Sequence, residues 1–318
     1  MSTQQQTTAV AVRPVDMLKN MINSDSVQQQ FQNALGKHKD GFVASLIDLY
    51  SGDKALQTCK PQDVIKQALM AATLNLPLNK ALGFSYIVVY NNNVKSVDAR
   101  GNTVWNKVPT PTFIPGYKGY IQLAMRTGQY RVINTDVIFE GELRVANKLT
   151  GEIALDGTKK SDKVIGYFAH IELLNGFSKT LFMPLENVAR HAKTYSPSLK
   201  NNNKVTVESL MALGRDRVFA GSVGWLGNFE SMALKTVLRN LLSHYGYLSI
   251  EMQQAFASDN EDAGAEAERN NANMQDLETV DVDAEVLRAT ELNEAGAEAE
   301  SAEQPQQTAP STPAGPAY

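Results

Sequence analysis

Residues 164–183, VIGYFAHIELLNGFSKTLFM, decide the predicted fold of this chain. Two runs rich in aromatic and β-branched residues flank Asn175-Gly176. An Asn-Gly pair between such runs is the strongest short-range signal of a β-hairpin. The stretch therefore predicts neighbouring antiparallel strands at Val164–Leu174 and Phe177–Met183.

Further elements extend outward from this hairpin. Strands are predicted upstream at Arg131–Phe139, Leu143–Leu149 and Glu152–Leu155, with Thr150-Gly151 as a second hairpin turn. Apolar residues at helical spacing, with caps and glycine stops, predict the helices; these are Ser26–Leu35, a helix capped by Asp40, one opened by Pro61, Tyr117–Thr127, Leu185–Lys193 and Phe229–Tyr245. The order predicts an α+β fold, with helices at both ends around a central antiparallel sheet with hairpins.

Two segments interrupt this pattern. A β-type run, Phe84–Tyr90, is followed by Asn91-Asn92-Asn93, so residues 91–112 are interpreted as a long polar excursion from a hairpin. Residues 197–222 form a second insertion, expected to be partly helical.

Charge divides the chain into two unlike parts. Residues 1–250 carry 28 Lys and Arg against 18 Asp and Glu, whereas residues 251–318 carry 2 against 16. We expect a disordered N-terminal arm at 1–24, a basic domain at 25–252 that binds polyanions, and a disordered acidic tail at 253–318. Within the tail, Met274–Leu292 has enough apolar residues for a short helix on a partner, although a solvated linker is the plainer interpretation.

The sequence gives no support for several classes of protein. The lone Cys59 excludes an internal disulfide and indicates a reducing compartment, and neither a signal peptide nor a membrane-length apolar run is present, so a cytoplasmic location is expected. Phosphate-loop and nucleophile-elbow motifs are missing, and the four histidines lack metal-ligand spacing. Glu140 and Glu142 leave open a metal-dependent nuclease, although such a pair is more often a solvated strand end. We expect no enzyme, no cofactor and no magnesium site on the protein.

Basic helix faces are the candidate sites. Lys118, Gln122 and Arg126 share one face of a helix whose start at Gly116 offers free backbone N–H groups. Lys235 and Arg239 share a face of the last helix and, lacking a nearby acid, are expected at a surface that binds phosphates. The other candidates for contact with DNA are Tyr117, Arg190, His191, Lys193, Tyr195 and Trp225.

Each candidate has a structural alternative. A basic face can belong to an ordinary amphipathic helix. Cations at Arg190–Lys193 also suit the negative end of a helix, and Tyr195 and Trp225 can be core residues rather than platforms for bases.

Four segments resemble the RecT family of phage single-strand annealing proteins. They are residues 114–130 (IPGYKGYIQLAMRTGQY), Asn175–Lys179, His191–Ser196 and residues 229–242 (FESMALKTVLRNLL). Their order and spacing agree from about residue 25 to 252, so the resemblance covers the whole basic part, apart from residues 91–112 and 197–222.

The resemblance implies a RecT/Red-beta-like annealing core that binds single-stranded DNA and anneals complementary strands without ATP. It also implies homo-oligomeric rings or helical filaments, a role in DNA recombination and repair, a paired exonuclease and a link to host single-strand-binding protein. The alternative is a non-enzymatic oligomeric scaffold whose acidic tail recruits partners.

Overall fold

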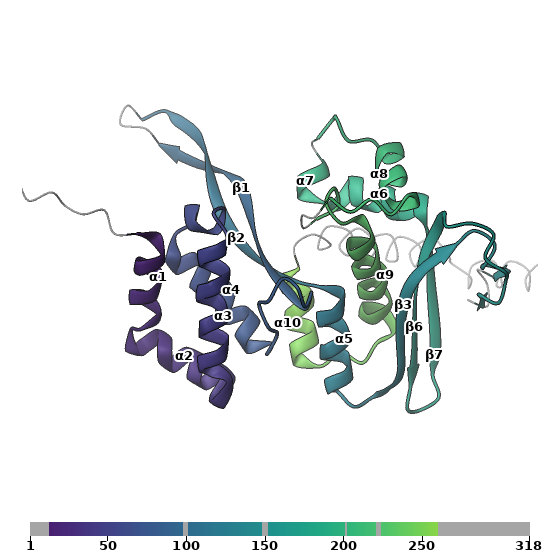
Figure 1. Ribbon diagram of the computed structural model, residues 1–318, viewed down its shortest axis with the longest axis horizontal. Coiled ribbons are helices and arrows are strands. Elements are labelled where there is room, and N and C mark those ends of the chain that lie inside the picture. The colour runs from purple at the N-terminus through teal and green to yellow at the C-terminus, as the bar shows by residue number, and fades with distance from the viewer. Residues whose placement is uncertain (1–12, 98–100, 148–151, 201, 221–223, 260–318) are drawn as a thin grey trace, which may run out of the picture. The chain divides into compact units, whose positions relative to one another are not determined.

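The computed structural model describes residues 13–97, 101–147, 152–200, 202–220 and 224–259 (Figure 1). Its largest sheet has three strands in the order β3–β6–β7, and both neighbouring pairs are antiparallel. The strands are β3 (Tyr130–Phe139), β6 (Val164–Leu173) and β7 (Ser178–Pro184). The predicted hairpin at Asn175-Gly176 joins β6 to β7. Gly176 has φ +88°, a left-handed conformation that glycine adopts without strain.

Two helices cover this sheet. Helix α9 (Phe229–Tyr245) packs on all three strands, and α6 (Leu185–Tyr195) packs on β6 and β7. Every residue of α9 from Met232 to Leu242 is buried, so other elements enclose this helix on all sides. The second insertion is partly helical, as predicted, with α7 (Pro197–Lys200) and α8 (Val207–Arg215) packed on α6.

Four helices precede the strands, and α1 packs on the other three. They are α1 (Pro14–Ile22), α2 (Asp25–Leu35), α3 (Lys39–Gly52) and α4 (Pro61–Thr73), with short 3-10 turns at Gly36–His38 and Leu56–Thr58. Helix α1 lies in the arm that was expected to be disordered. That expectation is wrong for this segment, because Leu18 and Ile22 are fully buried and α1 packs on α3 and α4.

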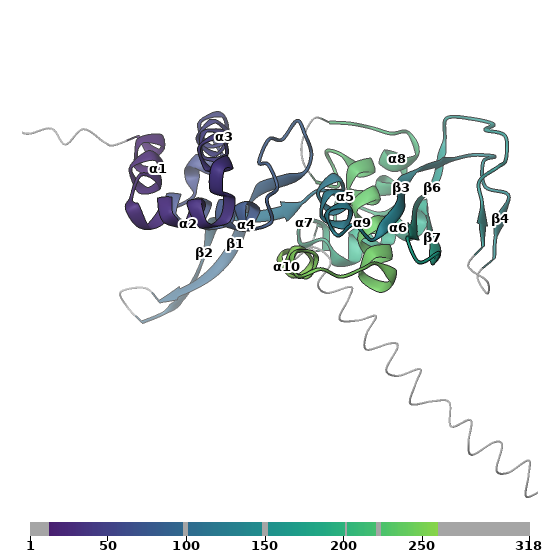
Figure 2. The same cartoon turned by 90° about the horizontal axis from the view of Figure 1, so that it is seen from below.

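A long two-stranded hairpin follows α4. Strands β1 (Ser85–Val97) and β2 (Thr103–Pro115) pair antiparallel over their whole length, from Ser85 opposite Pro115 to Val97 opposite Thr103. The interpretation of residues 91–112 as a polar excursion is therefore wrong, since the described part of this segment forms the outer arms of the hairpin. Pro109 and Pro111 are tolerated because each strand of a two-stranded ribbon has a free edge. The outer half extends away from the other described elements (Figures 1 and 2).

Helix α10 (Ile250–Ser258) extends the ordered core past residue 252, where the disordered tail was expected to begin. It packs on α5 (Tyr117–Arg126) and β2, and it buries Met252 and Ala255. The remaining tail, including Met274–Leu292, lies outside the described residues.

A small antiparallel pair, β4 (Val145–Ala146) with β5 (Ile153–Ala154), replaces the longer strands predicted at Leu143–Leu149 and Glu152–Leu155. The Thr150-Gly151 turn between them is outside the described residues.

The α+β class, with helices flanking antiparallel strands, is confirmed. Within the described ranges, no helix combines the length and apolar character that a bilayer crossing needs.

Candidate nucleic-acid interface

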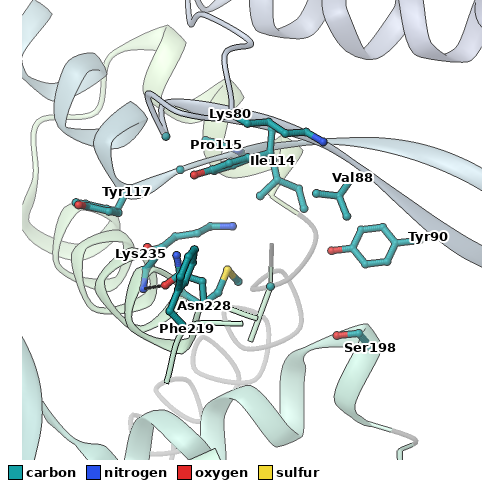
Figure 3. A pocket seen from close by; sticks show the side chains of 16 residues that line it. Lys80, Val88, Tyr90, Ile114, Pro115, Tyr117, Ser198, Phe219, Asn228 and Lys235 are labelled. Carbon is teal, nitrogen blue, oxygen red and sulfur yellow. Dashed lines mark hydrogen bonds between the residues drawn. The ribbon is translucent and has the colours of Figure 1, made fainter. Parts of the chain in front are cut away.

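A cavity of about 310 Å³ lies where the first half of the β1–β2 hairpin meets the first turns of α5 and α9 (Figure 3). Strand β1 contributes alternate side chains, Tyr86, Val88 and Tyr90, because residues two apart share one face of a strand. The remaining lining residues are Lys80, Gly83, Ile114, Pro115, Gly116, Tyr117, Ser198, Phe219, Gly224, Asn228, Ser231, Met232 and Lys235.

Two glycines bring the first turn of α5 against the chain before β1. A Cβ on Gly116 would lie 2.2 Å from the carbonyl oxygen of Gly83, and a Cβ on Gly119 would lie 2.2 Å from that of Phe84. The Gly116 N–H donates to the Phe84 carbonyl at 2.9 Å. The Gly-Tyr-Lys-Gly sequence is thus a close-packing motif that places Tyr117 at the cavity.

Aromatic rings form much of the cavity wall. Tyr86, Tyr90 and Tyr117 are half-buried, and Phe219 is 68% exposed. Burial raises the pKa of Tyr86; burial and then nearby Glu230 raise the pKa of Tyr117. Both phenols therefore stay neutral at pH 7 and do not repel phosphates. Rings of this kind can stack on bases without regard to sequence.

Two helix N-termini place partial positive charge at the cavity, and Glu230, the acid near Tyr117, is paired with Arg217. Gly116 and Tyr117 begin α5, while Asn228 and Ser231 begin α9, so two helix N-termini with their positive dipole ends meet there. The Asn228 side chain accepts from the Ser231 N–H at 3.1 Å and caps α9.

Lys80 adds a cation at the rim of the cavity and pairs with Asp53. Burial raises the pKa of Asp53, but hydrogen bonds from Lys80 and from backbone N–H groups outweigh it and hold that pKa below its usual range. The Asp53 carboxylate therefore stays ionised at neutral pH.

Lys235 and Arg239 are buried, with exposed fractions of 2% and 1%. The surface placement expected from the sequence is wrong, because Asp259, at the end of α10, provides the acid that α9 lacks. The Lys235 ammonium donates to Asp259 Oδ1 at 2.8 Å, and Arg239 Nε lies 3.8 Å from Oδ2. The Tyr120 hydroxyl also donates to Oδ2, at 2.7 Å. Lys235 nevertheless lines the cavity (Figure 3).

The predicted face of α5 divides into two environments. Lys118 is exposed and lies beside Gly83, a residue of the cavity wall, although Lys118 itself does not line the cavity. Gln122 is half-buried. Arg126 donates to the carbonyls of Leu74 and Asn75 at 2.7 and 2.8 Å, so its guanidinium holds the C-terminal end of α4.

The fold does not place the predicted DNA-contacting residues of α6 at the cavity. Arg190 pairs with Glu186 one turn earlier, and Lys193 donates to the carbonyls of Leu199 and Asn202. The ring of His191 lies 4.9 Å from that of Tyr195. Among the described residues that line the cavity, none of these candidates appears.

Trp225 is a core residue rather than a platform for bases. It is 3% exposed and packs edge-on against Phe229, with ring centroids 5.2 Å apart. A base cannot reach its faces in this arrangement.

Sequence reasoning missed Lys80, Tyr86, Tyr90 and Phe219 as candidates. The sequence did contain a signal for two of them. Tyr86 and Tyr90 lie an even number of residues apart on a predicted strand, so their side chains share one face of that strand. Lys80 and Phe219 lie in irregular segments, and only the tertiary fold brings them to the cavity. An isolated bridge between Phe219 and Asn228 holds Phe219 near the start of α9.

Glu140 and Glu142, the candidates for a nuclease site, have other partners. Glu140 accepts from the Ser161 hydroxyl at 2.7 Å, and Glu142 accepts from the Phe139 N–H at 2.7 Å. No group of three or more His, Cys, Asp or Glu within the described ranges is arranged to hold a metal ion.

Comparison with known proteins identifies the family. The model of the RecT family matches residues 40–274. The chain belongs to the RecT family. It is 40% identical over 245 residues to the uncharacterized protein YqaK of Bacillus subtilis strain 168, covering 77% of this chain and 72% of YqaK. It is 26% identical over 260 residues to Protein RecT of Escherichia coli K12, covering 78% of this chain and 82% of that protein.

Membership of the RecT family gives the chain a general role in binding and annealing single-stranded DNA during recombination. The family match begins at residue 40 and runs through α10, so it includes the whole cavity and Asp259.

Proposed function

We propose that this chain binds single-stranded DNA in the cavity between β1, α5 and α9, and anneals complementary strands as an ATP-independent oligomer. One observation carries the proposal: aromatic side chains, two helix N-termini and two lysines all line the same cavity.

The chemistry suits annealing. Contacts to phosphates hold a strand without reading its sequence, and stacking on tyrosines tolerates every base. A strand held in this way keeps its base edges free to pair with a second strand.

ATP independence is supported by the lack of a phosphate-loop sequence in the chain. The chemistry also needs no cofactor, because annealing forms and breaks no covalent bond. Magnesium acts on the DNA alone in this proposal.

Assembly with further copies of the chain is supported by exposed apolar side chains. Tyr245, Tyr247, Leu248 and Ile250 are between 42% and 72% exposed and lie within six residues of one another. Trp105, near the tip of the hairpin, is 64% exposed. A contiguous apolar patch formed by such side chains would serve as a site of protein association. A paired exonuclease and a host single-strand-binding protein are proposed partners of the acidic C-terminal segment.

The test mixes the full chain with two complementary labelled oligonucleotides, with ATP, without ATP and with a chelator. We expect equal annealing rates in all three, and assemblies larger than one chain by light scattering. A strict requirement for ATP would contradict the proposal. A chain that binds no single strand at low salt would favour the scaffold alternative, and magnesium-dependent cleavage of the DNA would favour a nuclease.

A further inference from the structure

The carboxylate of Asp259 occupies a buried cationic site. Lys235, Arg239 and Tyr120 surround it, at 2.8, 3.8 and 2.7 Å respectively, and none of the three residues is more than 2% exposed. Among the residues that the structure describes, two cations meet one acid there. Buried cations need an anionic partner, and Asp259 provides one in this state.

Helix α10, whose C-cap is Asp259, buries few of its residues in the core. Of the nine residues of α10, Met252 and Ala255 are buried. Phe256 adds a ring contact to Tyr120 at 5.3 Å and lies under the guanidinium of Arg239, also at 5.3 Å. Ile250, at the start of the helix, is 72% exposed. Asp259 is also the point at which the densely acidic segment of the chain begins.

The cationic site is joined to the proposed DNA cavity through Lys235, which lines the cavity (Figure 3) and also binds Asp259. Tyr120 is three residues after Tyr117, on the same helix, and Tyr117 also lines the cavity. A strand that enters the cavity along Tyr117 therefore meets Lys235.

A DNA phosphodiester matches the carboxylate in charge and in the number of free oxygens. Each carries one negative charge on two oxygens, so exchanging one for the other leaves the cluster with the same charge balance. The Tyr120 hydroxyl and the Lys235 ammonium can donate to either group.

We propose that Lys235, Arg239 and Tyr120 form a phosphodiester site, which Asp259 closes in the free protein and which a bound single strand opens by displacing Asp259 and α10. The proposal rests on the proposed function, because the strand must first occupy the cavity. Binding of the first phosphate then releases α10 and the acidic segment that follows it, so the free protein has a latch that only a strand in the cavity opens.

The first experiment compares two full-length variants, Asp259→Asn and Asp262→Asn, in binding a fluorescent oligothymidylate, which cannot pair with itself. Both remove one charge from the acidic segment, and only the first removes the latch. A tethered competitor acts at an effective concentration of about mM, so we expect Asp259→Asn to tighten binding on the order of tenfold at low salt. The Asp262→Asn variant should stay within about twofold of the unchanged chain. Equal affinities of the two variants, or weaker binding by a folded Asp259→Asn, would overturn the latch.

The second experiment needs no variant, so it decides the question even if Asp259→Asn fails to fold. Hydrogen exchange of the α10 amides is measured in the unchanged chain, with and without saturating oligothymidylate. The proposal expects faster exchange in α10 with the oligonucleotide. If the chain binds the oligonucleotide and α10 exchanges equally fast or more slowly, the latch is wrong and the proposed function stands. If the chain does not bind it, the proposed function is contradicted and the latch with it.

Discussion

Helices α5 and α9 look alike in the sequence and differ in the structure. Each carries cations on one face, Lys118 and Arg126 on α5 and Lys235 with Arg239 on α9. The α5 cations are exposed, whereas those of α9 are at most 2% exposed, because α10 ends over them with Asp259. Helical spacing tells which side chains share a face, and the tertiary fold decides whether another element covers that face.

The largest expected effect separates the two helices by stability. Changing Lys235 to Met should lower the free energy of unfolding by about 3–5 kcal/mol, since it breaks a buried ion pair. The matched change Lys118→Met should cost no more than about 0.5 kcal/mol, as at other surface positions. Urea denaturation measures both. Equal small losses would mean that Lys235 is exposed after all, as the sequence suggested.

The second prediction tests the close packing that sets α5 in place. Gly119→Ala should destabilise the protein by about 1–3 kcal/mol, because its Cβ would lie 2.2 Å from the Phe84 carbonyl oxygen. The control is Gly41→Ala on α3, where a Cβ meets no atom within 4 Å. That change should stabilise the helix by about 0.5–1 kcal/mol. Thermal melts of the two variants that shift in the same direction would show that the contact at Gly119 relaxes freely.

The third prediction concerns the aromatic wall of the cavity. Tyr117→Ala should weaken oligothymidylate binding by about 1–3 kcal/mol, the contribution of one stacked base. Tyr117→Phe keeps the ring and should bind within about twofold of the unchanged chain. A titration by fluorescence anisotropy measures both. If the two variants lose the same affinity, the hydroxyl matters rather than stacking.

The smallest effect separates the two ends of α5. Lys118→Ala should reduce the slope of log affinity against log salt by about 0.7, the value for one lost phosphate contact on a single strand. Arg126→Ala should leave that slope unchanged and instead lower stability by about 0.5–1.5 kcal/mol, because its hydrogen bonds to the end of α4 are partly exposed to solvent. A reduced slope for Arg126→Ala alone would reverse this assignment.

The order of elements was predictable from local patterns. The Asn-Gly turn, Gly36 after α2 and Pro61 at the start of α4 each act on a few neighbouring residues, so the sequence alone predicts their effects. The hairpin arms were missed because Asn91-Asn92-Asn93 and two prolines in β2 have the composition of a loop, and only pairing between the strands overrides it.

The site was less predictable for a different reason. Tyr117 was found because a recognisable motif contains it, whereas Lys80 and Phe219 reach the cavity from segments far apart in the sequence. The burial of Arg239 depends on Asp259, twenty residues further on, in a segment whose composition is typical of disorder.

The most direct test of the account is to find which residues touch the strand. The full chain is irradiated with single-stranded DNA carrying bromodeoxyuridine, and the crosslinked peptides are identified by mass spectrometry, with unlabelled oligonucleotide as competitor. We predict crosslinks on the cavity aromatics Tyr86, Tyr90, Tyr117 or Phe219, and their loss with competitor. Crosslinks confined to the outer surface of α1–α4, or to α6, would contradict the claim that this cavity binds the DNA.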